Sequence, residues 1–296
     1  MSNKNSRYAI CVYYDPNGQL QKFMEYFLLS LTELCSKVLL VVNGKLNEDF
    51  KNKTATLGVE ILQRENKGYD FSAYKEGYLF LKHHHQMNVN ELVFCNSSCY
   101  GPITSLKTIF EAMNKKDNDF WGLTQWHGTP WPDHIQSYFL VFRKSVFTSV
   151  HFERYWETLP EIADRREAIV KCEVLLTDFF EKKGFKWDTF IKPVRHEFCM
   201  TNVYEGLKKG QPLIKRKFFL LSQDIAEKKR VYEFLTNKTR YDVGLIHEDF
   251  FLTSCLSSSK KIKSLKNFVK VNYPKVSKIL ITIKHLLWTI WYKIIV

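Results

Sequence analysis

Two short groups of polar residues follow predicted strands and offer side chains of the kind that bind sugars, phosphates and metal ions. The groups are Asn66, Gly68 and Asp70, and further along the chain Asn96, Ser97 and Ser98. Open α/β sheets bind their ligands in the crevice beyond the carboxyl ends of the strands. These six residues are therefore the first candidates for a binding site.

The first group allows two interpretations. In a binding site, Gly68 lets the backbone approach a ligand closely, Asp70 reaches a ribose or a base, and the next helix offers free N–H groups to an anion. As a structural feature, Gly68 is a turn glycine and Asp70 is the N-cap of that helix. The spacing alone does not decide between the two.

The second group also has two explanations. Asn96, Ser97 and Ser98 can hold a diphosphate or a metal ion, but a magnesium site normally includes a carboxylate and this group has none. A polar turn is the simpler explanation. A binding site is favoured because another polar strand end lies one βα unit upstream.

Glu173 is a candidate general base near the start of a predicted helix at residues 164–183. A carboxylate in a partly closed site can take a proton from an acceptor hydroxyl. A glutamate in this position also stabilises the helix dipole, which requires no catalytic role.

The segment 125–136 lacks periodicity and contains two prolines, two tryptophans and two histidines. Long loops within compact domains are usually functional. Aromatic side chains here can stack on a sugar, so we expect the acceptor to be bound by aromatic and polar side chains of this region: Trp121, Trp131, His134 and Gln136. Asp133 is the alternative base.

Alternating strands and helices must position these residues. Apolar runs at 8–14, 37–42, 59–62 and 92–95 predict strands, and spacings of three and four predict helices at 20–34 and 70–81. Such alternation implies parallel strands joined by right-handed crossovers, and hence a three-layer α/β sandwich with a mostly parallel central sheet. Further predicted elements are helices at 105–113 and 146–156 and strands at 119–124, 137–143 and 186–191.

The composition excludes several classes. The chain has 296 residues, of which 45% are hydrophobic and 25% charged, as in an ordinary globular protein. Nine lysines after Asp249, where no acidic residue occurs, supply most of the net charge of +13. A nucleic-acid partner is therefore not expected. The seven cysteines show no paired CxxC spacing, and the N-terminus has no apolar signal region, so we expect reduced thiols and a cytoplasmic location.

The last segment, 260–296, predicts an interfacial helix. Its apolar residues recur at helical spacing, but the longest apolar stretch, 286–292, is far short of the roughly 20 residues that span a membrane. We expect this basic, amphipathic helix to hold the chain at an anionic membrane surface. The alternative is a helix that packs on the protein itself or on a partner.

Five blocks of the sequence resemble the rhamnan synthesis protein F family in that family's order. They are Asn66–Phe71, Asn96–Pro102, Asp119–Thr124, His134–Phe139 and Gly210–Lys215. The family is similar to GT-A-fold glycosyltransferases, which use nucleotide-activated sugars to build cell-surface polysaccharides and lipopolysaccharide O-antigen. The resemblance implies a GT-A-like domain over residues 1–225. The basic, amphipathic pattern near the C-terminus predicts a helical membrane-association segment over 226–296.

The resemblance also implies roles for single residues. Asn66, Gly68 and Asp70 would bind the donor nucleotide, Asn96, Ser97 and Ser98 would be equivalent to the GT-A metal and diphosphate motif, and Glu173 would be the catalytic base. Ser97 stands where many members have Asp, which leaves two routes. Either Asn96 and Ser98 hold Mg²⁺ or Mn²⁺ with help from elsewhere, or lysines and backbone amides neutralise the diphosphate.

We therefore expect an inverting glycosyltransferase that moves a sugar, plausibly L-rhamnose from dTDP-rhamnose, to a lipid-linked glycan at the inner face of the cell membrane. A retaining transferase on the same fold is a second possibility. A non-catalytic module that binds a nucleotide-sugar or a glycan is the alternative from another class.

Overall fold

The computed structural model of the chain describes residues 7–128, 131–192, 201–222 and 224–249. The chain forms two compact units, Met1–Tyr241 and Asp242–Val296. The candidate site residues all belong to the first unit. In the second unit only residues 242–249 are described. Of the predicted membrane-association segment 226–296, residues 226–249 are described, and the basic stretch 260–296 lies outside the described residues.

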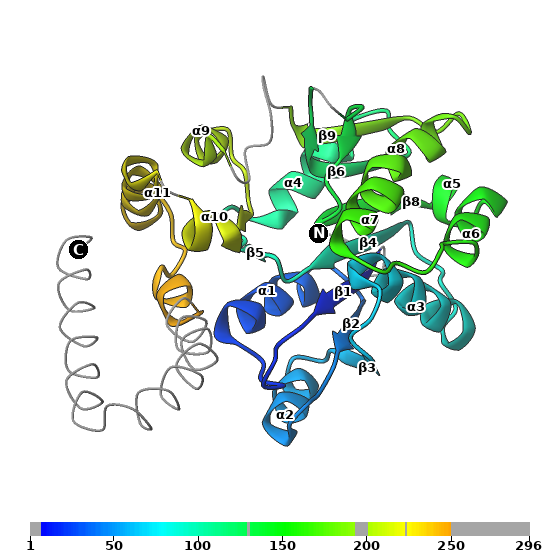
Figure 1. The fold of residues 1–296 in the computed structure, drawn as a ribbon, viewed down its shortest axis with the longest axis horizontal. Coiled ribbons are helices and arrows are strands. Elements are labelled where there is room, and N and C mark those ends of the chain that lie inside the picture. Colours follow the sequence, from blue (N-terminus) through cyan, green and yellow to red (C-terminus); the bar gives the residue numbers. More distant parts are fainter. Residues whose placement is uncertain (1–6, 129–130, 193–200, 223, 250–296) are drawn as a thin grey trace, which may run out of the picture. The chain divides into compact units, whose positions relative to one another are not determined.

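An eight-stranded sheet forms the centre of the first unit, with the order β3-β2-β1-β4-β8-β6-β7 and with β9 paired to β6 (Figure 1). The strands are β1 (Arg7–Tyr13), β2 (Lys37–Asn43), β3 (Glu60–Arg64), β4 (Glu91–Asn96), β6 (Phe120–Trp126), β7 (His134–Ile135), β8 (Phe139–Arg143) and β9 (Trp187–Ile191). The pairs β1–β2, β1–β4, β2–β3 and β6–β9 are parallel, whereas β8 runs antiparallel to β4 and β6. The predicted α/β fold with a mostly parallel sheet is confirmed.

The helices differ from the sequence-based prediction in several places. Helices at 48–56, 203–208 and 216–221 were not predicted, the helix expected at 146–156 is two helices, and the one expected at 164–183 is interrupted by a π-helical segment. The described helices are α1 (Lys22–Thr32), α2 (Glu48–Thr56), α3 (Tyr69–His84), α4 (Leu106–Met113), α5 (Lys144–Phe147), α6 (Val150–Glu157), α7 (Arg165–Glu167), η2 (Ala168–Glu173), α8 (Val174–Glu181), α9 (Val203–Lys208), α10 (Arg216–Leu221) and α11 (Ile225–Lys238).

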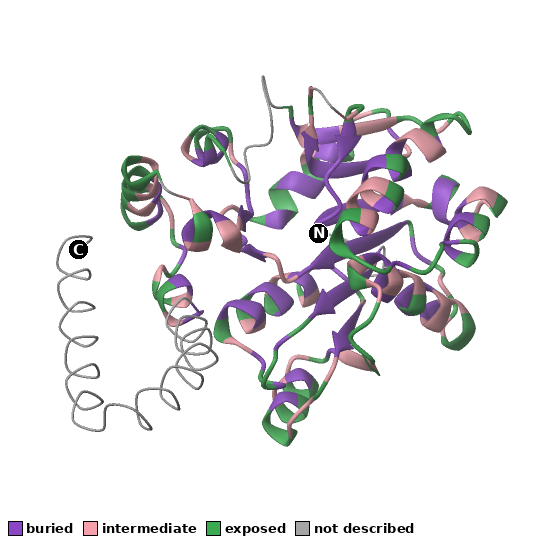
Figure 2. Cartoon of the chain, viewed as in Figure 1, coloured by how far each residue is buried: buried purple, intermediate pink, exposed green. Residues whose placement is uncertain are grey.

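Helices cover both faces of the sheet, which is buried between them (Figure 2). On one face, Phe94 of β4 stacks on Trp156 of α6 at 5.0 Å and meets Tyr74 of α3 edge-on at 5.2 Å. On the other face, Phe110 of α4 packs against Trp121 of β6 at 5.0 Å. Since side chains alternate between the faces of a strand, both apolar faces of the sheet are used and the fold is three-layered.

Helix α3 lies directly on β1 and β2 because Gly77 has no side chain. A Cβ at this position would come within 2.6 Å of Ile10 Cγ2 and 2.9 Å of Val41 Cγ2. This close packing fixes the N-terminus of α3, and with it Asp70, at the carboxyl end of the sheet.

A two-stranded antiparallel sheet joins distant parts of the chain at the same end. Strand β5 (Cys99–Tyr100) pairs with β10 (Ile214–Lys215), with Cys99 opposite Lys215. Arg216 N also donates to Ser98 O at 2.9 Å. Residues 214–217 are thereby brought beside the end of β4.

The five cysteines in the described residues are free and buried, in agreement with the expectation of reduced thiols. Within the same residues no helix is both long and apolar enough to cross a membrane.

Candidate active site

A cavity of about 470 Å³ opens beyond the end of β4, between α3, η2 and the start of α10. Its lining combines acidic, basic, amide and aromatic side chains: Asp70, Asn96, Ser98, Trp126, Trp131, His134, Gln136, Ser137, Arg165, Glu173, Lys215 and Lys217. The structure thus brings Asp70, Asn96, Ser98 and Glu173, all predicted from the sequence, to one cavity.

Asn96 connects the two polar strand ends. Its Nδ2 donates to Asp70 Oδ2 at 2.9 Å, and its Oδ1 accepts from Ser98 N at 3.1 Å and from Ser98 Oγ at 2.5 Å. Asn96 is buried, so these bonds hold its amide in one orientation. Asp70 and Ser98 are therefore positioned by the same side chain.

Asp70 is not the N-cap that its spacing suggested. Gly68 occupies the cap position in the left-handed conformation, with φ of +71°, and Asp70 lies in the first turn of α3 with its carboxylate directed to Asn96. Burial raises the pKa of Asp70, and the nearby Glu173 carboxylate raises it further, while Lys215, Asn96 and Lys217 oppose the shift. The environment thus makes a negative charge on Asp70 costly unless cations remain close.

Glu173 has the geometry of an oriented base. It ends the π-helical segment η2, a type of irregularity that is frequent at functional sites. Its Oε2 accepts hydrogen bonds from Ser137 N at 3.0 Å and from the Ser137 hydroxyl. None of the described residues donates to Oε1, which is left for a ligand in the cavity.

Lys215 brings a positive charge to the end of β4. Its Nζ donates to Ser98 Oγ at 2.9 Å and lies 4.3 Å from the centre of the Tyr138 ring. An ammonium group here stabilises anionic oxygens bound at the Asn96–Ser98 turn.

The aromatic loop contributes some of the predicted residues. Trp131, His134 and Gln136 line the cavity, with Gln136 Oε1 accepting from Thr124 Oγ1 at 2.7 Å. His134 Nδ1 lies 2.8 Å from the Pro132 carbonyl, which can only accept, so the proton belongs on Nδ1. Hydrogen bonds within the protein thus hold the side chains of His134 and Gln136 in place.

Trp121 and Asp133 were also predicted as site residues, but neither lines the cavity. Trp121 is fully buried and packs between Phe110 and Phe139, so the expectation that it contacts the acceptor is wrong. Asp133 does not line the cavity and is paired with His127 Nδ1 at 2.7 Å. Glu173 is thus the better placed of the two candidate bases.

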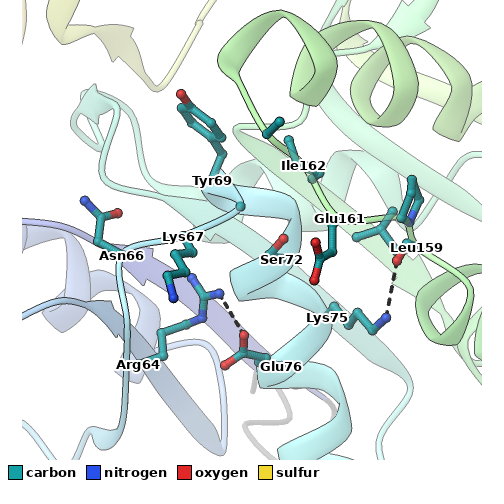
Figure 3. Close-up of a pocket in the computed structure, with 13 residues that line it drawn as sticks. Arg64, Asn66, Lys67, Tyr69, Ser72, Lys75, Glu76, Leu159, Glu161 and Ile162 are labelled. Atoms are coloured by element: carbon teal, nitrogen blue, oxygen red, sulfur yellow. Dashed lines mark hydrogen bonds and ion pairs between the residues drawn. The ribbon is translucent and has the colours of Figure 1, made fainter.

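Asn66 and Gly68 line a second cavity of about 770 Å³, which Tyr69 also lines (Figure 3). Tyr69 lines both cavities and has φ of +56°, which is rare for a bulky residue. Gly68 serves the turn, because a Cβ there would come within 2.0 Å of Ser72 Oγ. The first polar group is therefore divided between two adjoining cavities.

The residues at the end of β4 do not fit a divalent metal ion. Asn96 Oδ1 already accepts two hydrogen bonds from Ser98, Ser98 Oγ accepts from Lys215, and Ser97 does not line the cavity. No cluster of three or more His, Cys, Asp or Glu suited to a metal occurs in the described part of the chain. Carboxylate-rich oxygen sets, which Mg²⁺ prefers, are thus not formed here.

Sequence reasoning missed Ser137, Arg165, Lys215 and Lys217. Ser137 and Lys215 lie inside blocks that carry the family resemblance, so a signal for them existed. Arg165 and Lys217 reach the cavity only through the packing of α7 and α10, which no local pattern indicates.

Comparison with known proteins identifies a family. Residues 38–286 match the model of the family described as rhamnan synthesis protein F. An uncharacterized protein, y4gN, from Sinorhizobium fredii is 31% identical over 190 residues, which are 62% of this chain and 48% of that protein. The chain thus matches about half the length of this relative.

Similar solved structures share little sequence with the chain. 4-Diphosphocytidyl-2C-methyl-D-erythritol synthase from Anaerococcus prevotii is 12% identical, covers 66% of this chain and 88% of its own, and has a TM-score of 0.40. Glucosyl-3-phosphoglycerate synthase from Mycobacterium tuberculosis, in complex with Mn²⁺ and uridine diphosphate, is 10% identical. The match covers 49% of this chain and 59% of the synthase, with a TM-score of 0.35. Scores this low carry no argument about ligands or chemistry.

Proposed function

The chain belongs to the rhamnan synthesis protein F family, and from this we propose that it is a glycosyltransferase that uses a nucleotide-diphosphate sugar as donor. The observation that carries the proposal is that Glu173, fixed by Ser137, faces the same cavity as the linked Asp70, Asn96 and Ser98 side chains. A base and an anion-binding turn in one cavity are the two parts that sugar transfer requires.

The reaction is a single displacement with inversion. Glu173 Oε1 takes the proton of the acceptor hydroxyl as its oxygen forms a bond to the anomeric carbon. The bond between that carbon and the phosphate oxygen breaks, and its electron pair stays on the diphosphate. Holding both reactants in one cavity supplies much of the rate by orientation.

The remaining side chains bind the two substrates. Asp70 and Asn96 bind the donor, with the nucleoside directed past Tyr69 toward Asn66 and Gly68. Trp131, His134 and Gln136 receive the acceptor sugar, since an aromatic ring and fixed polar groups bind the two sides of a pyranose ring.

The donor that fits the family best is dTDP-L-rhamnose, and the acceptor is a lipid-linked glycan of a cell-surface polysaccharide such as an O-antigen. The nine lysines of residues 260–296 support delivery at an anionic membrane surface. In this arrangement residues 1–225 are the catalytic part and 226–296 the membrane-association segment.

A donor screen tests the proposal. The full chain is incubated with a panel of UDP-, GDP- and dTDP-sugars, and thermal shift and donor hydrolysis are measured. A matching donor raises the unfolding temperature by mass action and is turned over. Stabilisation without turnover, with or without acceptor, would favour the non-catalytic binding module.

A further inference from the structure

Three basic side chains of the cavity come from three separate parts of the chain. Arg165 begins α7, Lys215 ends β10, and Lys217 lies in the first turn of α10. All three line the cavity that holds Asn96 and Ser98.

Two of these cations form no direct ion pair within the described part of the chain. Neither Arg165 nor Lys217 makes a side-chain hydrogen bond or an ion pair with any of the described residues. Burial lowers the pKa of Lys217, and the positive charges of Arg165 and Lys215 lower it further, whereas the Asp70 carboxylate raises it. Like charges repel one another, and an anion bound among these three side chains lowers that cost.

We propose that Arg165, Lys215 and Lys217 form a diphosphate-binding site that neutralises the leaving group without a divalent metal ion. The role of this site in sugar transfer rests on the proposed function. Its ability to bind a diphosphate does not depend on that function. Lys215 determines where the diphosphate binds, because its Nζ is already hydrogen-bonded to Ser98 Oγ at the end of β4. Arg165 and Lys217 supply further donors to the same cavity, and a guanidinium group binds two phosphate oxygens at once.

The proposed site accommodates Ser97, which brings no carboxylate for a metal ion. A metal ion at the end of β4 would compete with the Lys215 ammonium for Ser98 Oγ. Three positive charges around a diphosphate would supply the electrostatic stabilisation that a metal ion gives elsewhere.

Calorimetry with inorganic pyrophosphate in EDTA tests the site on the full chain. Wild type should bind, and Arg165→Gln and Lys217→Gln should each weaken binding by about tenfold or more, the usual worth of a charged hydrogen bond. Lys229→Gln removes one exposed lysine of α11 and should change nothing. The charge-conserving Lys217→Arg should retain affinity within a few fold.

A second readout separates binding from folding. Because neither Arg165 nor Lys217 forms a direct ion pair among the described residues, the two Gln variants without ligand should unfold close to the wild-type temperature, while pyrophosphate stabilises them less. A requirement for Mg²⁺, or unchanged affinity in the double variant, would overturn the proposal. Pyrophosphate binding without turnover of any donor would refute the transferase and leave the anion site standing. Donor turnover that requires Mg²⁺ and is unchanged by both substitutions would support the transferase and refute the anion site.

Discussion

Lys215 Nζ donates a hydrogen bond to Ser98 Oγ at 2.9 Å, although 117 residues separate the two in the sequence. The contact depends on the pairing of β10 with β5, which aligns Lys215 with Cys99. It places a permanent cation where the resemblance suggested a metal motif, and it closes the cavity that Glu173 faces from the other side.

Glu173→Gln should lower turnover by roughly 10²-fold or more, in line with the contribution of a general base. The amide keeps the shape and can still accept from Ser137, so donor affinity and unfolding temperature should stay close to wild type. Rates are measured at saturating donor and acceptor. Glu181→Gln, in the last turn of α8 and exposed, is the matched control and should be fully active. Near-normal turnover in Glu173→Gln would move the base elsewhere.

Much of the sheet was predictable, because its strands are continuous apolar runs closed by polar turns. Leu92–Cys95 and its ending at Asn96 follow from such a pattern, as does a helix face through Tyr74 and Tyr78. The antiparallel direction of β8 was not predictable, because strand order and direction depend on contacts between distant segments.

The site was predictable only in part. Residues next to a strand end, such as Asp70 and Asn96, are marked by their neighbours in sequence. No neighbouring pattern in the sequence identifies Arg165 and Lys217 as site residues. The prediction for Trp121 was wrong because an aromatic residue on a strand belongs to the core more often than it contacts a ligand.

Asp70→Asn should make the unliganded protein more stable than wild type, and the difference should grow as pH rises. Because the folded-state pKa of Asp70 is raised, its contribution to stability is complete below the ordinary value of 3.8 and is lost as pH rises through the raised pKa. The variant lacks this loss, so its advantage in unfolding temperature should grow over that pH range. Donor affinity should fall by about tenfold, since a charged hydrogen-bond acceptor is removed. A pH-independent difference in unfolding temperature would contradict the assignment.

Tyr69→Gly should distinguish the two cavities. Glycine relieves the positive φ of Tyr69 but removes the side chain of a residue that lines both cavities. If the nucleoside passes Tyr69, affinity for a nucleoside diphosphate should fall by about tenfold, as loss of base stacking typically costs, while affinity for inorganic pyrophosphate is retained. Asn66→Ala, which alters only the second cavity, should show the same selectivity more weakly. Equal loss for both ligands would mean that the change disturbs the start of α3 instead.

Gly77→Ala should destabilise the fold although alanine is the better helix former. The new methyl group would meet Ile10 and Val41, and overpacking typically costs about 1–3 kcal/mol against a helix-propensity gain of about 1 kcal/mol. We expect a net loss of about 1 kcal/mol in the free energy of unfolding, measured in urea. Higher stability in the variant would show that α3 lies farther from β1 and β2.

Truncation after Ser259 should release the protein from anionic membranes and leave donor binding intact. The removed segment holds nine lysines, no acid and an apolar helical stripe interrupted by Lys284 and Lys293. Anionic lipid contributes about 1 kcal/mol per lysine near the surface, and the apolar stripe adds to this by burial at the interface. The full chain should therefore pellet at low salt with vesicles of phosphatidylglycerol and phosphatidylcholine, but not with phosphatidylcholine alone. The truncated chain should stay in the supernatant with both and keep the thermal shift given by its donor. If it still pelleted, or if the full chain did not, the segment would be a helix that packs on the protein or on a partner, because neither result is compatible with binding driven by these lysines.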